Sequence, residues 1–454
     1  MSVLPAERPA NAPAGQPRTA RPPRSRQHPA PSRASGTTFA ALGVAAALVT
    51  VLARDGITAP RPIQAAVLPD ALAGRDILGC AQTGSGKTLG FSLPLVARLA
   101  RGYTMACRPR GLVLVPTREL ATQVEAVLSP LAGALGLTVA VIFGGTPQRP
   151  QVAALRDRAD IVVACPGRLA DLIGQGHCHL GDVEVSVLDE ADQMADLGFL
   201  PEVRRLLEAT PPEGQRLLFS ATLDGEVDVL ARRFLARPVR HDVDTACPPA
   251  QIAHYLLTVP PSERVAVVAA LASGEGRALI FTRTRRGASK LARQLTMAGT
   301  PAAELHGDLA QGARSRNLAA FGSGEVRTMV ATDIAARGLH VDGIALVIHA
   351  DPPAEHKAYV HRSGRTARGG AAGTVVTVQT AAQSAEVRAL MRKAGVTPCA
   401  AAAGPGSAVL RSIAGPPARR TAPVARAARP ALVATQATGL GAVAVSGGFR
   451  GRRR

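Results

Sequence analysis

The stretch Ala81-Gln82-Thr83-Gly84-Ser85-Gly86-Lys87-Thr88 decides the fold class of this chain. Its glycines allow consecutive backbone N–H groups to converge on phosphate oxygens. Lys87 adds a positive charge at the β- and γ-phosphates, and the Thr88 hydroxyl can ligate Mg²⁺. The first position of the pattern is usually Gly and is Ala81 here. We interpret the stretch as a phosphate-binding loop, which in an α/β fold joins a strand to a helix.

A second stretch, Asp189-Glu190-Ala191-Asp192, directly follows the apolar run Val185-Ser186-Val187-Leu188. This order predicts two acids at the carboxyl end of a buried strand, where α/β folds bind their ligands. One acid there can hold a metal ion while its neighbour positions an attacking water. The two stretches together predict a nucleoside triphosphatase.

The charge of the chain indicates a polyanionic partner. The 454 residues are enough for two or three domains and carry a net charge of +20. Residues 1–36 contain six Arg and one Glu, and residues 401–454 contain nine Arg and no acidic residue. Only four Lys occur, so Arg supplies most of the charge. A GC-rich genome explains the excess of Arg over Lys equally well, and this composition favours a bacterial source and hence the cytoplasm.

Other features exclude several classes of protein. The six Cys form no Cys-x-x-Cys pair, which indicates reduced thiols in a cytosol rather than a disulfide framework. The run His177-Cys178-His179 favours a plain loop over a metal cluster, because adjacent residues rarely converge on one ion. The start of the chain lacks the apolar region of a signal peptide. Residues 39–53 are uncharged but too few to span a bilayer, so we expect a buried helix there and no membrane partner.

Apolar segments alternate with helical segments in two successive regions, which predicts α/β domains with parallel sheets and helices on both faces. We place a disordered Pro/Arg-rich extension at 1–36, a first domain at 37–245, a linker at 246–251, a second domain at 252–398 and a disordered Arg/Gly/Ala-rich tail at 399–454. The Gly-Arg end of the tail suits non-specific nucleic-acid contact, and an inert solubilising tail is the alternative. The predicted strands are Gly111–Val115, Thr138–Phe143, Asp160–Ala164, Val183–Leu188, Arg216–Phe219, Ala278–Phe281, Thr328–Ala331, Ala345–His349 and Gly373–Val378.

Further short motifs occur in a fixed order between and after the first two stretches. They are Pro116-Thr117-Arg118-Glu119-Leu120, Gly144-Gly145, Cys165-Pro166-Gly167-Arg168, Ser220-Ala221-Thr222, His306-Gly307-Asp308, Ala331-Thr332-Asp333 and His361-Arg362-Ser363-Gly364-Arg365-Thr366-Ala367-Arg368. The ordered set closely resembles the DEAD-box RNA helicases over residues 37–395. This resemblance implies two tandem RecA-like P-loop domains and an RNA-stimulated ATPase that binds ATP and Mg²⁺.

The resemblance also implies roles on the nucleotide side. Gln64 would read the adenine edge, supported by Phe39, because a carboxamide carries both a donor and an acceptor. The implied nucleotide-binding residues are Phe39, Gln64, Thr83, Gly84, Ser85, Gly86, Lys87, Thr88, Asp189 and Gly338, with Thr88 and Asp189 at the metal. The implied catalytic residues are Lys87, Asp189, Glu190 as the general base, and Arg365 and Arg368 as arginine fingers. The residues implied to couple hydrolysis to domain closure are Asp192, Ser220, Thr222, Asp333 and His361.

On the RNA side, the resemblance implies contacts to phosphates and sugars, which carry no base information. We therefore expect sequence-independent binding of single-stranded RNA and local, non-processive opening of short duplexes. Ribosomal and decay ribonucleoproteins are candidate partners. The implied contact residues are Pro116, Thr117, Arg118, Gly145, Pro166, Gly167 and Arg168 on the first domain, and Arg283, Thr284, Gly307, Arg314 and Thr332 on the second.

Two other functions remain as alternatives. An RNA chaperone would act mainly through the Arg-rich ends, with ATP only gating release, and its activity would persist without ATP. A DNA-translocating helicase is disfavoured by the combination of motifs and would require hydrolysis stimulated by DNA. Arg118 and Arg168 could instead be surface charges that pair with Glu119 and Asp171. The full set of motifs in this order favours nucleic-acid contacts for both arginines.

Four positions depart from the family pattern: Ile57, Arg61, Cys165 and His340. His340 stands where the family has an Asp that helps to hold the ribose. A neutral imidazole makes fewer acceptor bonds than a carboxylate. We therefore expect a raised KM for ATP or weakened coupling between RNA and ATP, with hydrolysis retained.

The substitution His340→Asp tests this expectation. It should lower the KM for ATP, because it restores a carboxylate to the ribose site. Steady-state ATP hydrolysis at saturating RNA measures the effect. An unchanged KM together with unchanged coupling to RNA would refute the assignment.

Overall fold

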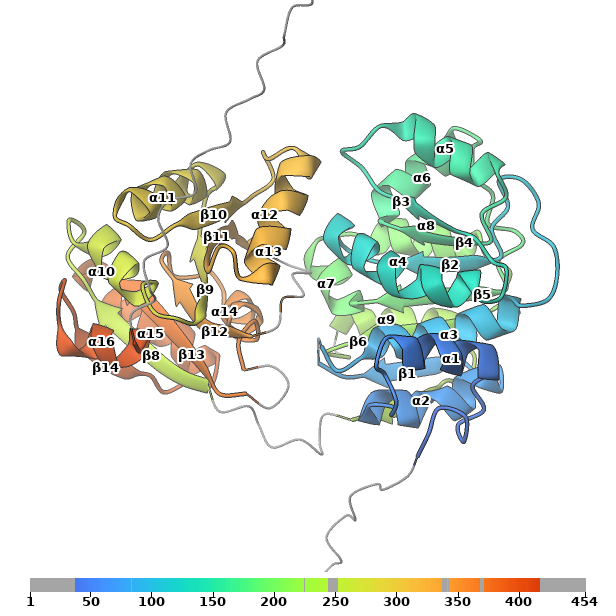
Figure 1. The fold of residues 1–454 in the computed structure, drawn as a ribbon, viewed down its shortest axis with the longest axis horizontal. Coiled ribbons are helices and arrows are strands. Elements are labelled where there is room, and N and C mark those ends of the chain that lie inside the picture. The colour runs from blue at the N-terminus through green and yellow to red at the C-terminus, as the bar shows by residue number, and fades with distance from the viewer. Residues whose placement is uncertain are drawn as a thin grey trace, which may run out of the picture.

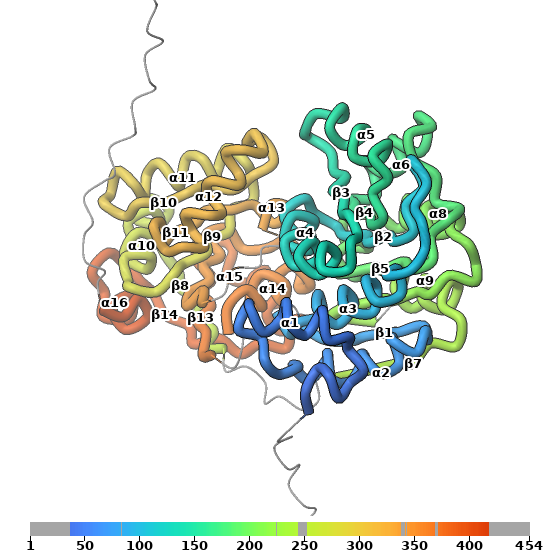
Figure 2. Tube along the Cα trace, turned by 45° about the vertical axis from the view of Figure 1, so that its right-hand side comes forward, coloured from blue at the N-terminus to red at the C-terminus, as the bar shows by residue number. Residues whose placement is uncertain are grey.

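The computed structural model describes residues 37–82, 84–223, 225–243, 252–336, 341, 343–367 and 371–416. These residues form two lobes, each built around one sheet (Figures 1 and 2). The predicted extension at 1–36, the linker at 246–251 and the tail beyond 416 lie outside the described residues, as do Thr83, Gly338, His340 and Arg368.

The first domain contains alternating strands and helices between residues 46 and 242. They are α1 (Ala46–Arg54), α2 (Pro62–Leu72), β1 (Ile77–Cys80), α3 (Lys87–Leu99), β2 (Gly111–Leu114), α4 (Arg118–Gly133), β3 (Val139–Ile142), α5 (Gln148–Arg156), β4 (Ile161–Ala164), α6 (Pro166–Gly174), β5 (Val185–Asp189), α7 (Ala191–Asp196), α8 (Leu200–Glu208), β6 (Gln215–Ser220), α9 (Gly225–Phe234) and β7 (Val239–Asp242).

The sheet of this domain is parallel and has the strand order β3-β4-β2-β5-β6-β1-β7 among the described residues. Its central strands are buried on both faces, so they are continuous apolar runs rather than alternating ones. Helices α1 to α4 pack on one face, where Leu48, Leu95 and Val124 join a single core cluster. Helices α5 to α9 cover the other face, where Leu155 and Leu230 belong to a second cluster.

The second domain repeats this architecture. Its elements are β8 (Ile252–Thr258), α10 (Arg264–Leu271), β9 (Arg277–Thr282), α11 (Arg285–Met297), β10 (Ala302–Leu305), α12 (Gln311–Ser323), β11 (Thr328–Thr332), α13 (Asp333–Ala336), β12 (Ile344–His349), α14 (His356–Ser363), β13 (Gly373–Gln379), the 3₁₀ helix η3 (Ala381–Gln383), α15 (Ser384–Lys393), β14 (Cys399–Ala402) and α16 (Ala408–Ala414).

The second sheet is also parallel, in the order β10-β11-β9-β12-β13-β8-β14. Helices α10, α11 and α16 share one apolar cluster, and α12 to α15 share the other. The two-domain α/β fold with parallel sheets is therefore confirmed. All the predicted strands exist, with ends displaced by at most two residues. Strands β1, β7, β8, β10 and β14 were not predicted.

Two boundaries predicted from the sequence are wrong. Ordered structure does not end at 398, because β14 pairs with β8 and Leu410 of α16 is buried against α10. The run of Ala around 400 is small enough to pair at a sheet edge, and composition alone hides this. The helix expected over 39–53 begins only at Ala46, because Gly43 takes a positive φ of 89° and ends a turn over the preceding residues. No helix among the described residues is both long and apolar enough to cross a membrane.

A close contact in the first sheet gives a test of its packing. Gly79 on β1 pairs with Phe219 on β6, and a Cβ added at Gly79 would lie 2.6 Å from the Phe219 ring. Gly79→Ala should lower the free energy of unfolding by about 1–3 kcal/mol, because the buried ring has no room to move. Urea denaturation of the full chain measures the change.

Gly133→Ala is the matched control, since no heavy atom lies within 4 Å of its added Cβ at the end of α4. It should leave stability unchanged or raise it by up to about 1 kcal/mol. Equal stabilities for the Gly79 variant and the wild type would contradict the packing argument.

Candidate functional site

The phosphate-binding loop connects β1 to α3 as the sequence predicts. Gly84 and Gly86 have φ values of 88° and 97°, which only glycine adopts without strain. Gly86 is the N-cap of α3, so Lys87 and Thr88 lie in the first turn of a 13-residue helix. The positive end of a helix dipole favours an anion at this position. The Ser85 hydroxyl is buried and has no hydrogen-bond partner among the described residues.

Lys87 and the acids that follow β5 meet in the interior. The Lys87 ammonium is 4% exposed, lies 3.0 Å from a Glu190 carboxylate oxygen and donates to the Ala81 carbonyl oxygen at 3.0 Å. Burial alone would lower the pKa of Lys87, but Glu190 and Asp189 raise it above its usual value. Glu190 has a left-handed backbone with φ of 55°, an uncommon conformation for a residue other than glycine. Sequence reasoning did not predict this ion pair.

Asp189 is almost fully buried at the end of β5. Burial raises the pKa of Asp189 to about 7, Lys87 opposes this rise and Glu190 adds to it. No group of three or more His, Cys, Asp or Glu side chains within the described residues could hold a metal by itself. Mg²⁺ is characteristically bound through one or two carboxylates, water and substrate phosphates. Asp189, the Thr88 hydroxyl and the unpaired Ser85 hydroxyl therefore fit a metal that arrives with a triphosphate.

The predicted adenine-reading residue is tied to the phosphate-binding loop. The Gln64 amide donates to the Gly86 carbonyl oxygen at 2.9 Å, and its own oxygen accepts from the Arg61 backbone N–H. The Arg61 guanidinium donates to the Gly84 carbonyl oxygen at 2.6 Å. Arg61, a departure from the family pattern, thus links α2 to the loop, a role that the sequence did not reveal. Phe39 is 1% exposed and belongs to the core cluster beside α1 and α2.

The stretch Asp189–Asp192 is hydrogen-bonded to the motif Ser220-Ala221-Thr222, which begins at the last residue of β6. The Asp192 carboxylate accepts from the Thr222 backbone N–H at 3.1 Å and from its hydroxyl at 3.4 Å. The Asp192 backbone N–H donates to the Ser220 hydroxyl at 3.1 Å. Burial, followed by repulsion from Glu190, raises the pKa of Asp192. The predicted coupling residues Asp192, Ser220 and Thr222 are therefore in contact.

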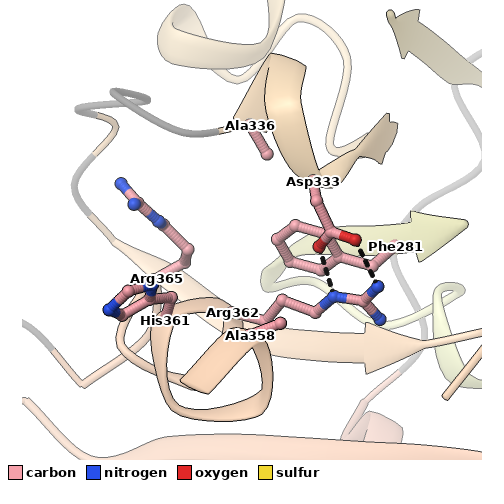
Figure 3. Close-up of a pocket in the computed structure, with 7 residues that line it drawn as sticks. All are labelled: Phe281, Asp333, Ala336, Ala358, His361, Arg362 and Arg365. Carbon is pink, nitrogen blue, oxygen red and sulfur yellow. Dashed lines mark hydrogen bonds and ion pairs between the residues drawn. The ribbon is translucent and has the colours of Figure 1, made fainter. Parts of the chain in front are cut away.

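Figure 3 shows His361, Arg362 and Arg365, three residues of the arginine-rich motif on the second domain. Arg362 makes a bidentate pair with Asp333 at 2.5 and 2.7 Å, donates to the Asp351 carbonyl oxygen and lies over the Phe281 ring. This pairing anchors α14 to α13 and to β9. Arg365 extends from the end of α14 on the side of His361 and away from Asp333 (Figure 3). The sequence predicted a role for Arg365 but missed the structural role of Arg362.

Within the described residues, polar contacts join the two domains at two places. The Arg314 guanidinium lies 2.8 Å from a Glu119 carboxylate oxygen, and both side chains are buried. Gln311 contacts Glu119 and Arg118 at 3.4 Å. At the second place, His361 Nδ1 lies 3.2 Å from the Asp196 carboxylate. Arg314, predicted to face RNA, is thus bound to an acid of the first domain, and its contact with RNA stays a prediction.

The other predicted RNA-contacting residues gather at the carboxyl ends of neighbouring strands. On the first domain they follow β2, β3 and β4, and on the second they follow β9, β10 and β11, which are adjacent in each sheet. Thr117 and Thr284 cap α4 and α11 by accepting from backbone N–H groups. Arg168 donates to the Thr146 carbonyl oxygen at 3.3 Å. Arg118 of the first domain contacts Gln311 of the second. The predicted RNA-contacting loops of both domains therefore lie beside this contact between the domains.

Comparisons with known proteins agree with this geometry. The family profile described as DEAD/DEAH box helicase matches residues 61–230, and that of the helicase conserved C-terminal domain matches residues 263–370. The chain is 41% identical over 338 residues to DEAD-box ATP-dependent RNA helicase 30 of Arabidopsis thaliana, covering 73% of this chain and 57% of that protein. It is 38% identical to helicase 20 of the same plant, covering 75% of this chain and 70% of that protein.

Solved structures show the same likeness. Saccharomyces cerevisiae Dbp5 bound to RNA and ADP BeF3 has a TM-score of 0.71 at 26% identity, covering 81% of this chain and 96% of that one. Mss116p bound to ssRNA and AMP-PNP has a TM-score of 0.71 at 26% identity, covering 84% and 82% of the two chains. The chain spans between about half and 70% of the length of several of the curated relatives that it matches.

The buried Lys87–Glu190 pair can be tested through stability. Lys87→Met should lower the free energy of unfolding by about 3–5 kcal/mol, because it leaves Glu190 buried without its counter-charge. Adding Glu190→Gln should recover much of this loss. Urea denaturation of the wild type, both single variants and the double variant measures the coupling. Additive single effects would contradict a direct pair, and exposed Lys290→Met is the control.

The contact between domains can be tested by exchanging its charges. Glu119→Arg places two guanidinium groups together and should separate the domains at this point, which small-angle X-ray scattering detects as a larger radius of gyration. Adding Arg314→Glu restores an opposite pair and should bring the value back. If Glu119→Arg leaves the radius of gyration at the wild-type value, the contact does not hold the domains together.

Proposed function

The chain belongs to the DEAD-box family of ATP-dependent RNA helicases, and we propose that it hydrolyses ATP when single-stranded RNA brings its two domains together. This proposal rests on the division of the candidate catalytic residues between the two domains. Lys87, Asp189 and Glu190 lie on the first domain, whereas Arg365 lies on the second. Hydrolysis that needs both sets must wait for the domains to close.

The residues of the first domain would bind the triphosphate. The backbone N–H groups around Gly84 and Gly86 and the first turn of α3 suit the phosphates. Asp189 and Thr88 would hold Mg²⁺, which supplies charge neutralisation at the phosphate oxygens when bound. A phosphate that takes over Lys87 would compete with Glu190 for the same ammonium. Glu190 would then be free to orient the attacking water and accept its proton.

The second domain would supply a positive charge to the nucleotide site. Arg365 would stabilise the negative charge that develops on the transferred phosphoryl group, as an arginine finger does. Arg362, held by Asp333, fixes the end of α14 from which Arg365 extends. His361 already contacts Asp196, four residues after the Asp192 that binds Thr222. These contacts offer a route by which closure and hydrolysis affect each other.

The RNA-facing loops support binding without sequence preference. Backbone groups, threonine hydroxyls and arginines at the strand ends suit phosphates and sugars rather than base edges. The 2′-hydroxyl would give preference for RNA over DNA. Closure of the two loop sets on one strand would bend it and open a short duplex locally. We place the protein in the cytoplasm of a bacterium on its Arg-rich, Lys-poor composition, with ribosomal or decay ribonucleoproteins as partners.

ATP hydrolysis with and without single-stranded RNA tests the proposal. RNA should stimulate the wild type, and Glu190→Gln should lower kcat by about 10²–10⁴-fold because the general base is lost. Glu184→Gln is the control, because its carboxylate pairs with Arg110 before β5 and lies outside the site. RNA binding with hydrolysis in neither protein would overturn the proposal. An RNA chaperone would instead lose its activity on removal of residues 1–36 and 417–454.

A further inference from the structure

A groove on the first domain lies outside the site described above. It has a volume of about 440 Å³ and is formed by α5 and the turn after α6. Arg149, Val152, Ala153 and Arg156 lie three, four and seven residues apart, so they share one face of α5. His177 faces this stripe from the turn. The groove thus has two arginines flanking a small apolar patch, with an imidazole opposite.

Within the residues that the structure describes, the two arginines of the groove, like Arg54 and Arg98, lack the carboxylate partner that several other arginines of this domain have. Arg108, Arg110, Arg232 and Arg233 each pair with a carboxylate. Arg149 and Arg156 are exposed and have no carboxylate within ion-pair distance in the described part of the chain. The acidic residue that lines the groove is Asp157, at the C-cap of α5 beside Arg156. The groove is therefore net positive, and its more positive end is at Arg149.

The positive end of the groove adjoins a loop predicted to contact RNA. Gln151 of α5 accepts from the Phe143 backbone N–H and donates to the Phe143 carbonyl oxygen and to the Thr146 hydroxyl. These bonds enclose Gly144 and Gly145. The Gln148 amide donates to the Gln175 side-chain oxygen at 2.5 Å and ties α5 to the turn after α6. A strand that leaves the Gly145 loop along α5 would enter the groove at Arg149.

We propose that this groove binds the phosphates of RNA that extends beyond the segment held between the two domains. The inference rests on the function proposed above. Arg149 and Arg156 are two helical turns apart, about 10 Å along the axis, so each would meet a different phosphate. A guanidinium binds phosphate through two parallel hydrogen bonds. Ala153, which is exposed between the two arginines, offers an apolar contact to the intervening sugar, whereas Val152 is largely buried.

Binding of RNAs of two lengths tests the proposal. Fluorescence anisotropy compares single-stranded RNAs of about 10 and about 30 nucleotides. Arg149→Ala/Arg156→Ala should weaken binding of the long RNA about tenfold and lower the slope of log affinity against log salt by about 1.4, at about 0.7 for each lost contact. Binding of the short RNA, and the hydrolysis that it stimulates, should not change.

Two further double variants distinguish the effect of losing positive charge in general from the effect of losing it in the groove. Arg54→Ala/Arg98→Ala removes the same charge from exposed positions on α1 and α3, which lie away from α5, and should retain the wild-type affinity (Figures 1 and 2). Arg149→Lys/Arg156→Lys should keep most of the affinity for the long RNA.

The proposal is overturned if the alanine variant binds the long RNA as the wild type does, which is also the result expected of a groove for an acidic protein. Equal losses for the two RNAs overturn it as well, because the groove would then belong to the core site. Failure of the short RNA to stimulate hydrolysis by the wild type would instead count against the proposed function.

Discussion

A buried ammonium needs a counter-charge, and Lys87 obtains it from Glu190. This requirement holds the phosphate-binding loop against the end of β5 and places Asp189 and Glu190 beside the positions where phosphates would bind. It also occupies the Glu190 carboxylate, which we propose as the general base. Within the first domain, Lys87 and Glu190 are thus paired with each other, and under the proposed function a bound triphosphate would compete for the Lys87 ammonium.

The second domain is held by its own ion pair. Arg362 and Asp333 fix α14, so that Arg365 extends from a rigid support. The domains meet through Glu119 and Arg314 and through Asp196 and His361. The Glu119–Arg314 contact lies beside the loops proposed to bind RNA. The Asp196–His361 contact lies close to the stretch Asp189–Asp192. Both ligands would therefore act on the same relative placement of the domains.

Much of this site was predictable because it lies at strand ends. In a parallel sheet the carboxyl ends of neighbouring strands meet at one edge, so short motifs after successive strands converge without any long-range information. The Lys87–Glu190 and Arg314–Glu119 pairs were not predictable in this way, since no local pattern tells which buried charges meet. The sequence identified Arg61 only as a departure from the family pattern, and no local pattern predicted that its guanidinium donates to the Gly84 carbonyl oxygen. Strand β14 was missed because its alanines resemble the composition of the tail.

We expect RNA and nucleotide to act together on the distance between the domains. Dyes introduced at Val229 and Met297, which are exposed on the first and second domain, report this distance by fluorescence energy transfer. The energy transfer should change strongly only when single-stranded RNA and a non-hydrolysable ATP analogue are both present. The same change with the analogue alone, or none with both ligands, would contradict this expectation.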